Sequence, residues 1–127
     1  MLCYAGDPYQ ANGEHEDIFL HEFAHSVDVM ALRDLNPAFG TALEAAYQNA
    51  LDNGLFENTY ADDTVEEYWA EGVQTWFNTN LESDPPNGLH NSVNTRAELE
   101  SYDPALHGLI SRIFPTDYDG GCPAGAP

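Results

Sequence analysis

Apolar residues recur at the spacing of an α-helix in five segments of this 127-residue chain. We expect helices over residues 14–35, 36–54, 63–80, 95–102 and 103–114. Several begin with an N-capping residue, such as Asn36 before Pro37 or Thr95 three residues before Glu98. The prolines and asparagines of residues 81–94 predict a long loop. Because no strand–helix–strand alternation is present, the sequence predicts a mainly α fold.

The segment 63–80 carries large apolar residues at helical spacing, which we assign to the core. They are Val65, Tyr68, Trp69, Val73, Trp76 and Phe77. Asp63 and Glu66 have the spacing of a capping box, which predicts a helix start at Asp63. The helix over 14–35 has apolar faces formed by Ile18, Leu20, Phe23, Ala24, Val27, Met30 and Ala31. We expect a single domain over residues 1–127, which is long enough for one modest core.

The charge balance excludes some partners. The 22 acidic residues face three arginines and no lysine, so the formal net charge is -19. Nucleic acids and anionic membranes are poor partners for such a surface, whereas metal ions and other cations are favoured. A hydrophobic content of 43% is too high for a disordered chain. No apolar run approaches the length of a membrane span, so membrane insertion is not expected.

The two cysteines, Cys3 and Cys122, lie close to opposite ends of the chain. In an oxidising compartment they could form a disulfide, and closing so long a loop is worth roughly 4 kcal/mol in the chain-entropy model. Two unrelated thiols are the alternative. A lysine-free acidic chain with few cysteines favours an extracellular or secreted location, although no signal peptide opens the sequence.

The stretch HEFAH, residues 21–25, places two histidines four residues apart on a predicted helix. Residues at this spacing lie on one helix face, so His21 and His25 can bind the same metal ion. Glu22 points about 100° away around the helix, which keeps it off the ion but within reach of a water on it. In this H-E-x-x-H arrangement two imidazoles bind Zn²⁺ and the glutamate takes a proton from the water.

A catalytic zinc ion needs a third protein ligand. Glu67 and Glu71 are the best candidates, since they lie four residues apart on the segment 63–80. One of them can bind the ion while the other accepts a hydrogen bond from the far nitrogen of a ligating histidine. Two solvated acids on an exposed face, or a metal-free structural cluster, are the alternatives.

Two motifs together, HEFAHSVD and EYWAE, resemble the gluzincin metallopeptidases. The likeness is greatest to the branch that contains the anthrax lethal factor catalytic domain, and it covers residues 15–80. It implies that Glu67 is the third zinc ligand and that Glu71 is its partner in the outer shell. It also implies that Tyr60, seven residues before Glu67, helps to stabilise the oxyanion.

The resemblance implies a zincin-like helical core, made of an active-site helix and a glutamate-bearing helix. Peptidases of this kind carry a β-sheet before the active-site helix, whereas only the loop-like residues 1–13 precede it here. We therefore expect this sheet to be reduced or absent, or to belong to a larger protein of which the chain is a fragment.

The expected function is zinc-dependent hydrolysis of peptide bonds in a peptide or protein substrate. Glu22 is expected to activate the zinc-bound water, and Tyr60 to share the charge of the oxyanion with the metal. The alternative is a zinc-binding module or fragment with weak or no catalysis, which the lack of an upstream sheet favours. The sequence predicts neither the cleavage specificity nor the oligomeric state.

Other polar residues carry weaker expectations. Asp28 could orient a zinc ligand from the outer shell, or make only a local contact. His90 could touch the substrate near the metal. Arg96 is expected to pair with buried acids rather than to bind a substrate carboxylate. Two further histidines are expected at the surface, His15 and His107.

Overall fold

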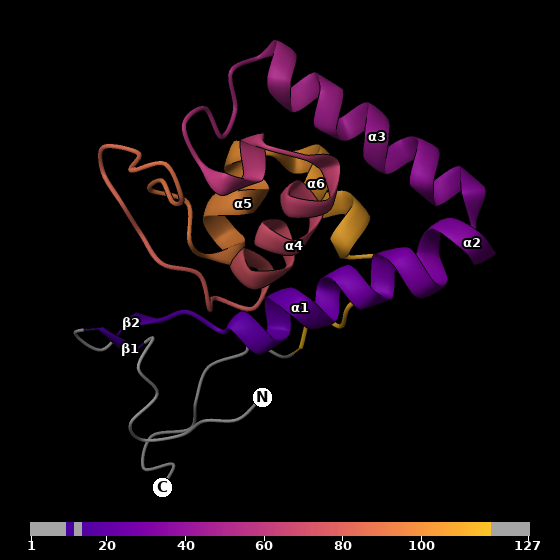
Figure 1. Cartoon of the computed structure of the whole chain (residues 1–127), viewed down its shortest axis with the longest axis horizontal. Helices are drawn as coiled ribbons and strands as arrows, with labels where there is room; N and C mark the ends of the chain where they lie inside the picture. Colours follow the sequence, from indigo (N-terminus) through magenta and orange to yellow (C-terminus); the bar gives the residue numbers. More distant parts are fainter. Residues whose placement is uncertain (1–9, 12–13, 118–127) are drawn as a thin grey trace, which may run out of the picture.

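The computed structural model describes residues 10–11 and 14–117, and Figure 1 shows how their elements are arranged. In chain order these are β1 (Gln10–Ala11), β2 (Glu14–His15), α1 (Ile18–Val27), the π-helical turn η1 (Asp28–Leu32), α2 (Arg33–Leu35), α3 (Pro37–Asp52), the 3₁₀ turn η2 (Tyr60–Asp62), α4 (Val65–Trp76), α5 (Arg96–Tyr102) and α6 (Pro104–Ile110). The prediction of a mainly α fold is confirmed.

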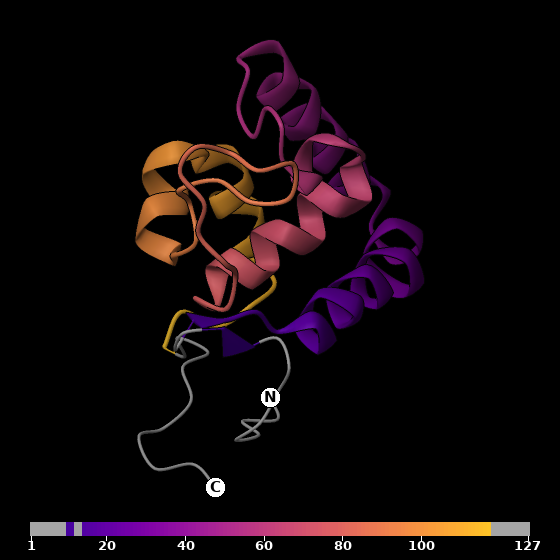
Figure 2. The same cartoon turned by 60° about the vertical axis from the view of Figure 1, so that its left-hand side comes forward.

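Helix α4 lies at the centre of the fold. Every residue from Tyr68 to Trp76 is buried. Helix α1 packs along one side of α4, while α5 and α6 pack on the other, as Figure 2 shows. Helix α3 contacts both α4 and α6. The largest fully buried side chains, Trp69, Trp76 and Tyr68, belong to α4 and fill the core between the surrounding helices.

The packing of α4 on α6 is tight at Gly72. A Cβ atom at this position would lie 2.6 Å from Cδ2 of Leu106 and 3.1 Å from Cδ1 of Ile110. Leu106 and Ile110 are fully buried, so neither side chain has free space to move into. The absence of a side chain at Gly72 therefore allows the two helices to approach closely.

Helix α1 begins at Ile18, four residues later than predicted. Asp17 caps it, because its side chain accepts a hydrogen bond of 3.0 Å from the backbone N–H of Leu20. Residues 10–11 and 14–15 form a short antiparallel ladder, so Glu14 and His15 do not belong to a first helical turn. Its residue pairs are Gln10 with His15 and Ala11 with Glu14.

Helix α4 begins one residue later than the predicted capping box implies. Thr64 is the cap, and its hydroxyl accepts a hydrogen bond of 3.2 Å from the N–H of Glu67. The prediction of Asp63 was wrong because Asp63 has a helical backbone at the end of η2, whereas Thr64 has the extended backbone that a cap requires. The caps predicted at Asn36 and at the Thr95–Glu98 capping box are confirmed, and Asp103 caps α6.

Three predicted helices differ from the structure in length or regularity. The helix over 14–35 contains the π-helical turn η1, in which the N–H of Arg33 binds the carbonyl of Asp28. The helices over 63–80 and 103–114 end early, at Trp76 and Ile110. Residues 81–94 form a loop without helix or strand, as predicted.

The apolar faces predicted for α1 are only partly buried. Ala24 is fully buried, but Phe23 and Met30 are 46% and 77% exposed. Helix α1 turns Ala24 and the two histidines of HEFAH toward α4, so the phenylalanine side of the helix faces away from the core. Phe23 and Met30 belong to the predicted apolar faces but lie at the surface.

Some expectations concern parts of the chain that the structure does not describe. Cys3 and Cys122 lie outside the described residues, as does the side chain of His15. Among the helices of residues 18–110, none combines the length and the apolar character needed to cross a bilayer.

Candidate metal centre

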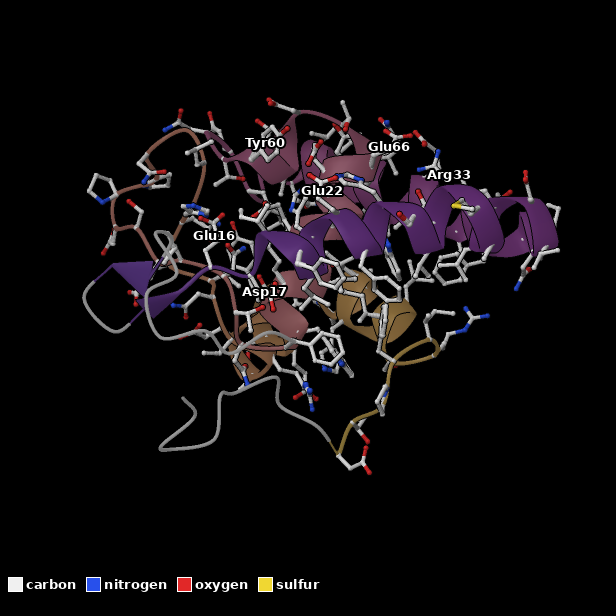
Figure 3. All side chains as sticks on the ribbon, turned by 60° about the horizontal axis from the view of Figure 1, so that its bottom comes forward. Glu16, Asp17, Glu22, Arg33, Tyr60 and Glu66 are labelled. Atoms are coloured by element: carbon white, nitrogen blue, oxygen red, sulfur yellow. The ribbon has the colours of Figure 1, made fainter. Side chains whose placement is uncertain are left out.

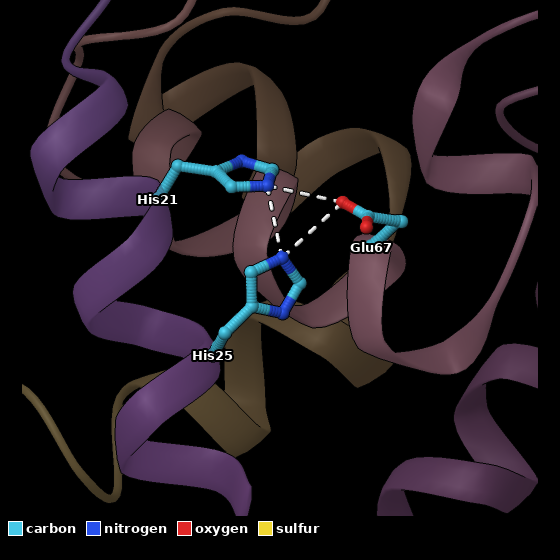
Figure 4. A group of neighbouring side chains, drawn as sticks. All are labelled: His21, His25 and Glu67. Atoms are coloured by element: carbon cyan, nitrogen blue, oxygen red, sulfur yellow. Dashed lines mark hydrogen bonds and ion pairs between the residues drawn. The ribbon is translucent and has the colours of Figure 1, made fainter.

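Three side chains from α1 and α4 converge where these helices meet. Nε2 of His21 lies 3.0 Å from Nε2 of His25 and 3.0 Å from Oε2 of Glu67. Nε2 of His25 lies 3.3 Å from the same carboxylate oxygen. Figure 4 shows the triangle that these atoms form. The structure therefore brings together the three predicted zinc ligands, which come from elements far apart in the sequence.

The other ring nitrogen of His21 faces two acceptors. Nδ1 lies 2.8 Å from Oε1 of Gln74 and 3.2 Å from Oε1 of Glu71. Amide and carboxylate oxygens only accept hydrogen bonds, so Nδ1 carries a proton. In a neutral ring Nε2 then has a bare lone pair, and this lone pair points at the carboxylate of Glu67. The two groups repel each other unless a proton or a metal ion lies between them.

The site attracts positive charge at His21. Burial of the ring lowers its pKa, but hydrogen bonds to Glu71 and Gln74 and the charges of Glu71 and Glu67 outweigh burial and raise the pKa from 6.5 to about 9. The same carboxylates favour a divalent cation, which would replace the proton on Nε2. Either a proton on Nε2 of His21 or a metal ion can therefore remove the repulsion between His21 and Glu67.

The donor set fits zinc. Zinc is bound tetrahedrally by imidazole nitrogen and carboxylate oxygen at about 2.0–2.2 Å, which separates neighbouring ligand atoms by about 3.3–3.6 Å. The observed separations of 3.0, 3.0 and 3.3 Å need only a small outward movement to accept the ion. Calcium and magnesium prefer a shell of oxygen atoms. Three protein ligands also leave one position open, as in catalytic zinc sites.

Glu71 contacts Nδ1 of His21, the nitrogen that faces away from His25 and Glu67. Besides its contact with His21, it accepts a hydrogen bond of 2.8 Å from the amide of Asn80 through Oε2. Its side chain is almost completely buried. A buried carboxylate in this place adds negative charge beside the imidazole and strengthens the attraction for a cation.

Asp28 binds an arginine rather than a ligating histidine. Its Oδ1 accepts a hydrogen bond of 2.9 Å from Nε of Arg33, and its Oδ2 forms an ion pair of 2.7 Å with Nη2. Arg33 also donates a hydrogen bond of 2.8 Å to Oε1 of Glu66. Both oxygens of Asp28 thus contact Arg33, which corresponds to the local contact that the sequence analysis gave as the alternative. This bridge ties η1 to the first turn of α4.

A cleft of about 450 Å³ opens onto the three converging side chains. It is lined by Glu16, Ile18, His21, Glu22, His25, Tyr60, Glu67, Glu71, Leu89 and His90. Glu22 is exposed on α1, and Figure 3 shows Glu22 and Tyr60 on the same side of this helix. The predicted proton acceptor and the predicted oxyanion partner therefore both face the cleft.

Tyr60 lies against the candidate metal centre. Its ring is nearly parallel to that of His21, with an angle of 14° and 6.1 Å between the ring centres. The charge of Glu67, then burial and a hydrogen bond to the same carboxylate, raise the pKa of the Tyr60 hydroxyl. The hydroxyl is therefore protonated at neutral pH and is able to donate a hydrogen bond.

His90 and Glu16 form a wall of the cleft. His90 is 8% exposed, and its Nε2 lies 3.7 Å from Oε1 of Glu16 while its Nδ1 lies 4.0 Å from Oε2 of Glu71. Burial raises the pKa of Glu16, opposed by the charge of His90 and reinforced by that of Glu71. The loop histidine thus reaches the cleft, as its prediction requires, whereas the sequence analysis missed Glu16.

Arg96 and His107 lie together away from the cleft. The guanidinium of Arg96 stacks over Trp76 at 4.4 Å and donates hydrogen bonds to the carbonyls of Trp76 and Thr116. The ring of His107 packs against the same indole, with 4.9 Å between the ring centres. His107 is half-buried, so its placement at the surface was only partly correct.

Gln74 is a polar residue of α4 that the sequence analysis missed. It is fully buried, although the predicted core contained only apolar positions of this helix. It lies seven residues after Glu67 and three after Glu71, so helical geometry places all three on one face. This shared face could have identified Gln74 as part of the site.

Comparisons with protein-family models, with curated proteins and with solved structures returned no match. The case for a function therefore depends on the chemistry of the site.

Proposed function

We propose that this protein binds one zinc ion through His21, His25 and Glu67 and hydrolyses peptide bonds. The resemblance of the motifs HEFAHSVD and EYWAE to the gluzincin metallopeptidases supports this function. Its main support is the His21–Glu67 contact, in which Nδ1 is fixed as a donor while Nε2 and a carboxylate oxygen meet at 3.0 Å. A divalent cation satisfies this contact and also the neighbouring nitrogen of His25.

When bound, zinc would act as a Lewis acid toward water and the scissile carbonyl. Glu22 would take a proton from the attacking water, because its carboxylate lies next to a ligand in sequence but points elsewhere on α1. It would then give this proton to the departing amine. The Tyr60 hydroxyl would donate a hydrogen bond to the oxygen that gains negative charge, and its raised pKa keeps it protonated for this task.

A zinc-binding protein with little or no turnover is the second candidate. Two observations favour it. Glu22 is exposed on the rim of the cleft, where solvent can compete for its carboxylate. Among the described residues before α1, the only ladder is formed by the two-residue strands β1 and β2, which offer little edge for an extended peptide. In this case the metal centre would serve binding or stability rather than hydrolysis.

Metal analysis and one substitution separate these candidates. We expect about one zinc ion per chain after dialysis against a zinc buffer, and cleavage of an unstructured protein such as casein. Glu22→Gln should retain zinc but lose nearly all cleavage, since it removes the proton acceptor and not a ligand. Glu100→Gln, an exposed residue of α5, is the matched control and should retain both.

Each other outcome has a definite meaning. Zinc at one ion per chain without cleavage by the unaltered protein would favour the binding protein. Absence of bound zinc would contradict both candidates and support a metal-free cluster held by a protonated His21.

A further inference from the structure

We propose that Gln74 is a positioning residue of the metal centre: it holds the proton on Nδ1 of His21 and thereby directs Nε2 toward the metal. The inference depends on the zinc-binding half of the proposed function and not on hydrolysis. It assigns to a neutral amide a task that the sequence pattern gives to the carboxylate of Glu71.

The amide of Gln74 can adopt only one orientation. Its Nε2 donates a hydrogen bond of 3.3 Å to the backbone carbonyl of Asp17, which leaves Oε1 to face Nδ1 of His21 at 2.8 Å. If the amide were flipped, its oxygen would face the carbonyl oxygen of Asp17, and two acceptors would meet. The carbonyl of Asp17 therefore fixes the amide, and the amide in turn fixes the tautomer of His21.

Gln74 also fixes the position of the imidazole relative to α4. Asp17 caps α1, and its backbone N–H donates a hydrogen bond of 3.0 Å to the carbonyl of Thr79, just after α4. The fully buried side chain of Gln74 thus contacts both Asp17, at the start of α1, and His21, one turn later. Gln74 therefore fixes both the orientation of the His21 ring and the position of α1 relative to α4, and it does so without a bound metal ion.

The second acceptor at Nδ1 does not replace Gln74. Glu71 lies 0.4 Å farther from Nδ1, at 3.2 Å against 2.8 Å. One N–H makes one strong hydrogen bond, and the shorter contact marks Gln74 as its main acceptor. Glu71 adds a second, longer contact and its negative charge, and its Oε2 accepts a hydrogen bond of 2.8 Å from the amide of Asn80.

The test is zinc affinity, measured by competition with a chromophoric chelator. Gln74→Met keeps most of the volume but removes the acceptor, and we expect it to weaken zinc binding about 10- to 100-fold. Gln74→Glu restores an acceptor for Nδ1 and should bind zinc more tightly than Gln74→Met. This rescue is not expected from a purely structural role, because a glutamate cannot donate to the carbonyl of Asp17.

The matched control is Tyr68→Phe. Tyr68 is a fully buried residue of the same helix whose hydroxyl donates a hydrogen bond to Asp103, away from the cleft. Its loss should lower the melting temperature without changing zinc affinity. If Gln74→Met bound zinc within about twofold of the unaltered protein, the positioning role would be refuted while zinc binding stood. Absence of zinc binding by the unaltered protein would refute both proposals.

A second readout needs no variant. In the zinc-loaded protein, long-range ¹H–¹⁵N NMR spectra of the histidine rings report which nitrogen of His21 carries the proton. We expect a protonated Nδ1 and a metal-bound Nε2. Zinc on Nδ1 would overturn the proposal even if Gln74→Met did not fold.

Discussion

The two faces of α4 satisfy their buried polar groups in different ways. The face toward α1 carries Glu67, Glu71 and Gln74, and its contacts leave two imidazole nitrogens and a carboxylate oxygen about 3 Å apart with a need for positive charge. An adjacent face carries Tyr68, whose hydroxyl donates a hydrogen bond of 2.6 Å to Oδ2 of Asp103 and needs nothing further.

This difference separates polar residues that stabilise the fold from those that serve a ligand. The pair on the α6 side is complete within the chain, since Asp103 also caps α6 through its other oxygen. The group on the α1 side is complete only with a proton or a cation. Changes on the first side should therefore alter stability alone, and changes on the second should alter metal binding.

The largest effect on stability is expected at the bridge between η1 and α4. Arg33→Met would leave the carboxylate of Asp28, which has no exposed surface, without its guanidinium partner. We expect the free energy of unfolding to fall by about 3–5 kcal/mol, measured by urea denaturation. Arg112→Met, an exposed arginine near the ring of Phe39, is the control and should change stability by less than about 1 kcal/mol. Equal losses for both variants would contradict the role of the bridge.

The largest effect on metal binding is expected at Glu67. Glu67→Gln replaces a charged ligand by a neutral amide, and zinc affinity should fall by more than about 100-fold, measured by chelator competition. Its neighbour Glu66 binds Arg33 and does not line the cleft, so Glu66→Gln is the matched control. A similar loss of zinc affinity in both variants would mean that total charge, not ligation, attracts the ion.

The pH dependence of stability should differ between the metal-free and the zinc-loaded protein. In the metal-free protein the pKa of His21 is raised from 6.5 to about 9, so its contribution is complete below pH 6.5 and is lost as the pH rises through 9. Zinc competes with this proton, so the stabilisation by zinc should grow over the same range. Melting curves from pH 6 to 9.5, in chelator and in zinc, test both trends. His107→Gln should leave them unchanged, whereas a metal-free protein that gains stability toward pH 9 would contradict the assignment to His21.

The sequence was sufficient to predict the parts of the molecule that depend on local rules. The capping box at Thr95 and the cap at Asn36 follow from residue type and spacing, and both are present. Helical spacing paired His21 with His25 and restricted the third ligand to Glu67 or Glu71, and the resemblance to the gluzincins implied Glu67, which lies with the two histidines in the structure.

The missed features depend on tertiary packing. The residues around Gln74 in the sequence do not indicate that its amide contacts Asp17 and His21, because both partners lie more than 50 residues before it. Asp28 has ligand-like spacing after His25, but the π-helical turn brings Arg33 to it instead. Tyr68 was correctly assigned to the core by its spacing, yet the partner of its hydroxyl, Asp103, is set by the packing of α4 on α6.

The smallest effect is expected for this last pair, and it gives the sharpest test of the division between the two faces of α4. Burial and the carboxylate of Asp103 raise the pKa of Tyr68, so its phenol stays protonated and donates. Tyr68→Phe leaves Oδ2 of a buried aspartate without this donor, which should lower the free energy of unfolding by about 1–3 kcal/mol in urea denaturation. Zinc affinity should stay within about twofold of the unaltered protein, because no atom of the pair reaches the cleft.

Tyr47→Phe is the control for the loss of a phenol hydroxyl, and it removes a hydrogen bond to the backbone carbonyl of Asp62. It should lower the free energy of unfolding by less than Tyr68→Phe does, because leaving a neutral carbonyl without a donor costs less than leaving a carboxylate without one. A marked loss of zinc affinity in Tyr68→Phe would mean that the two faces are coupled through α4, and that its polar residues form one network.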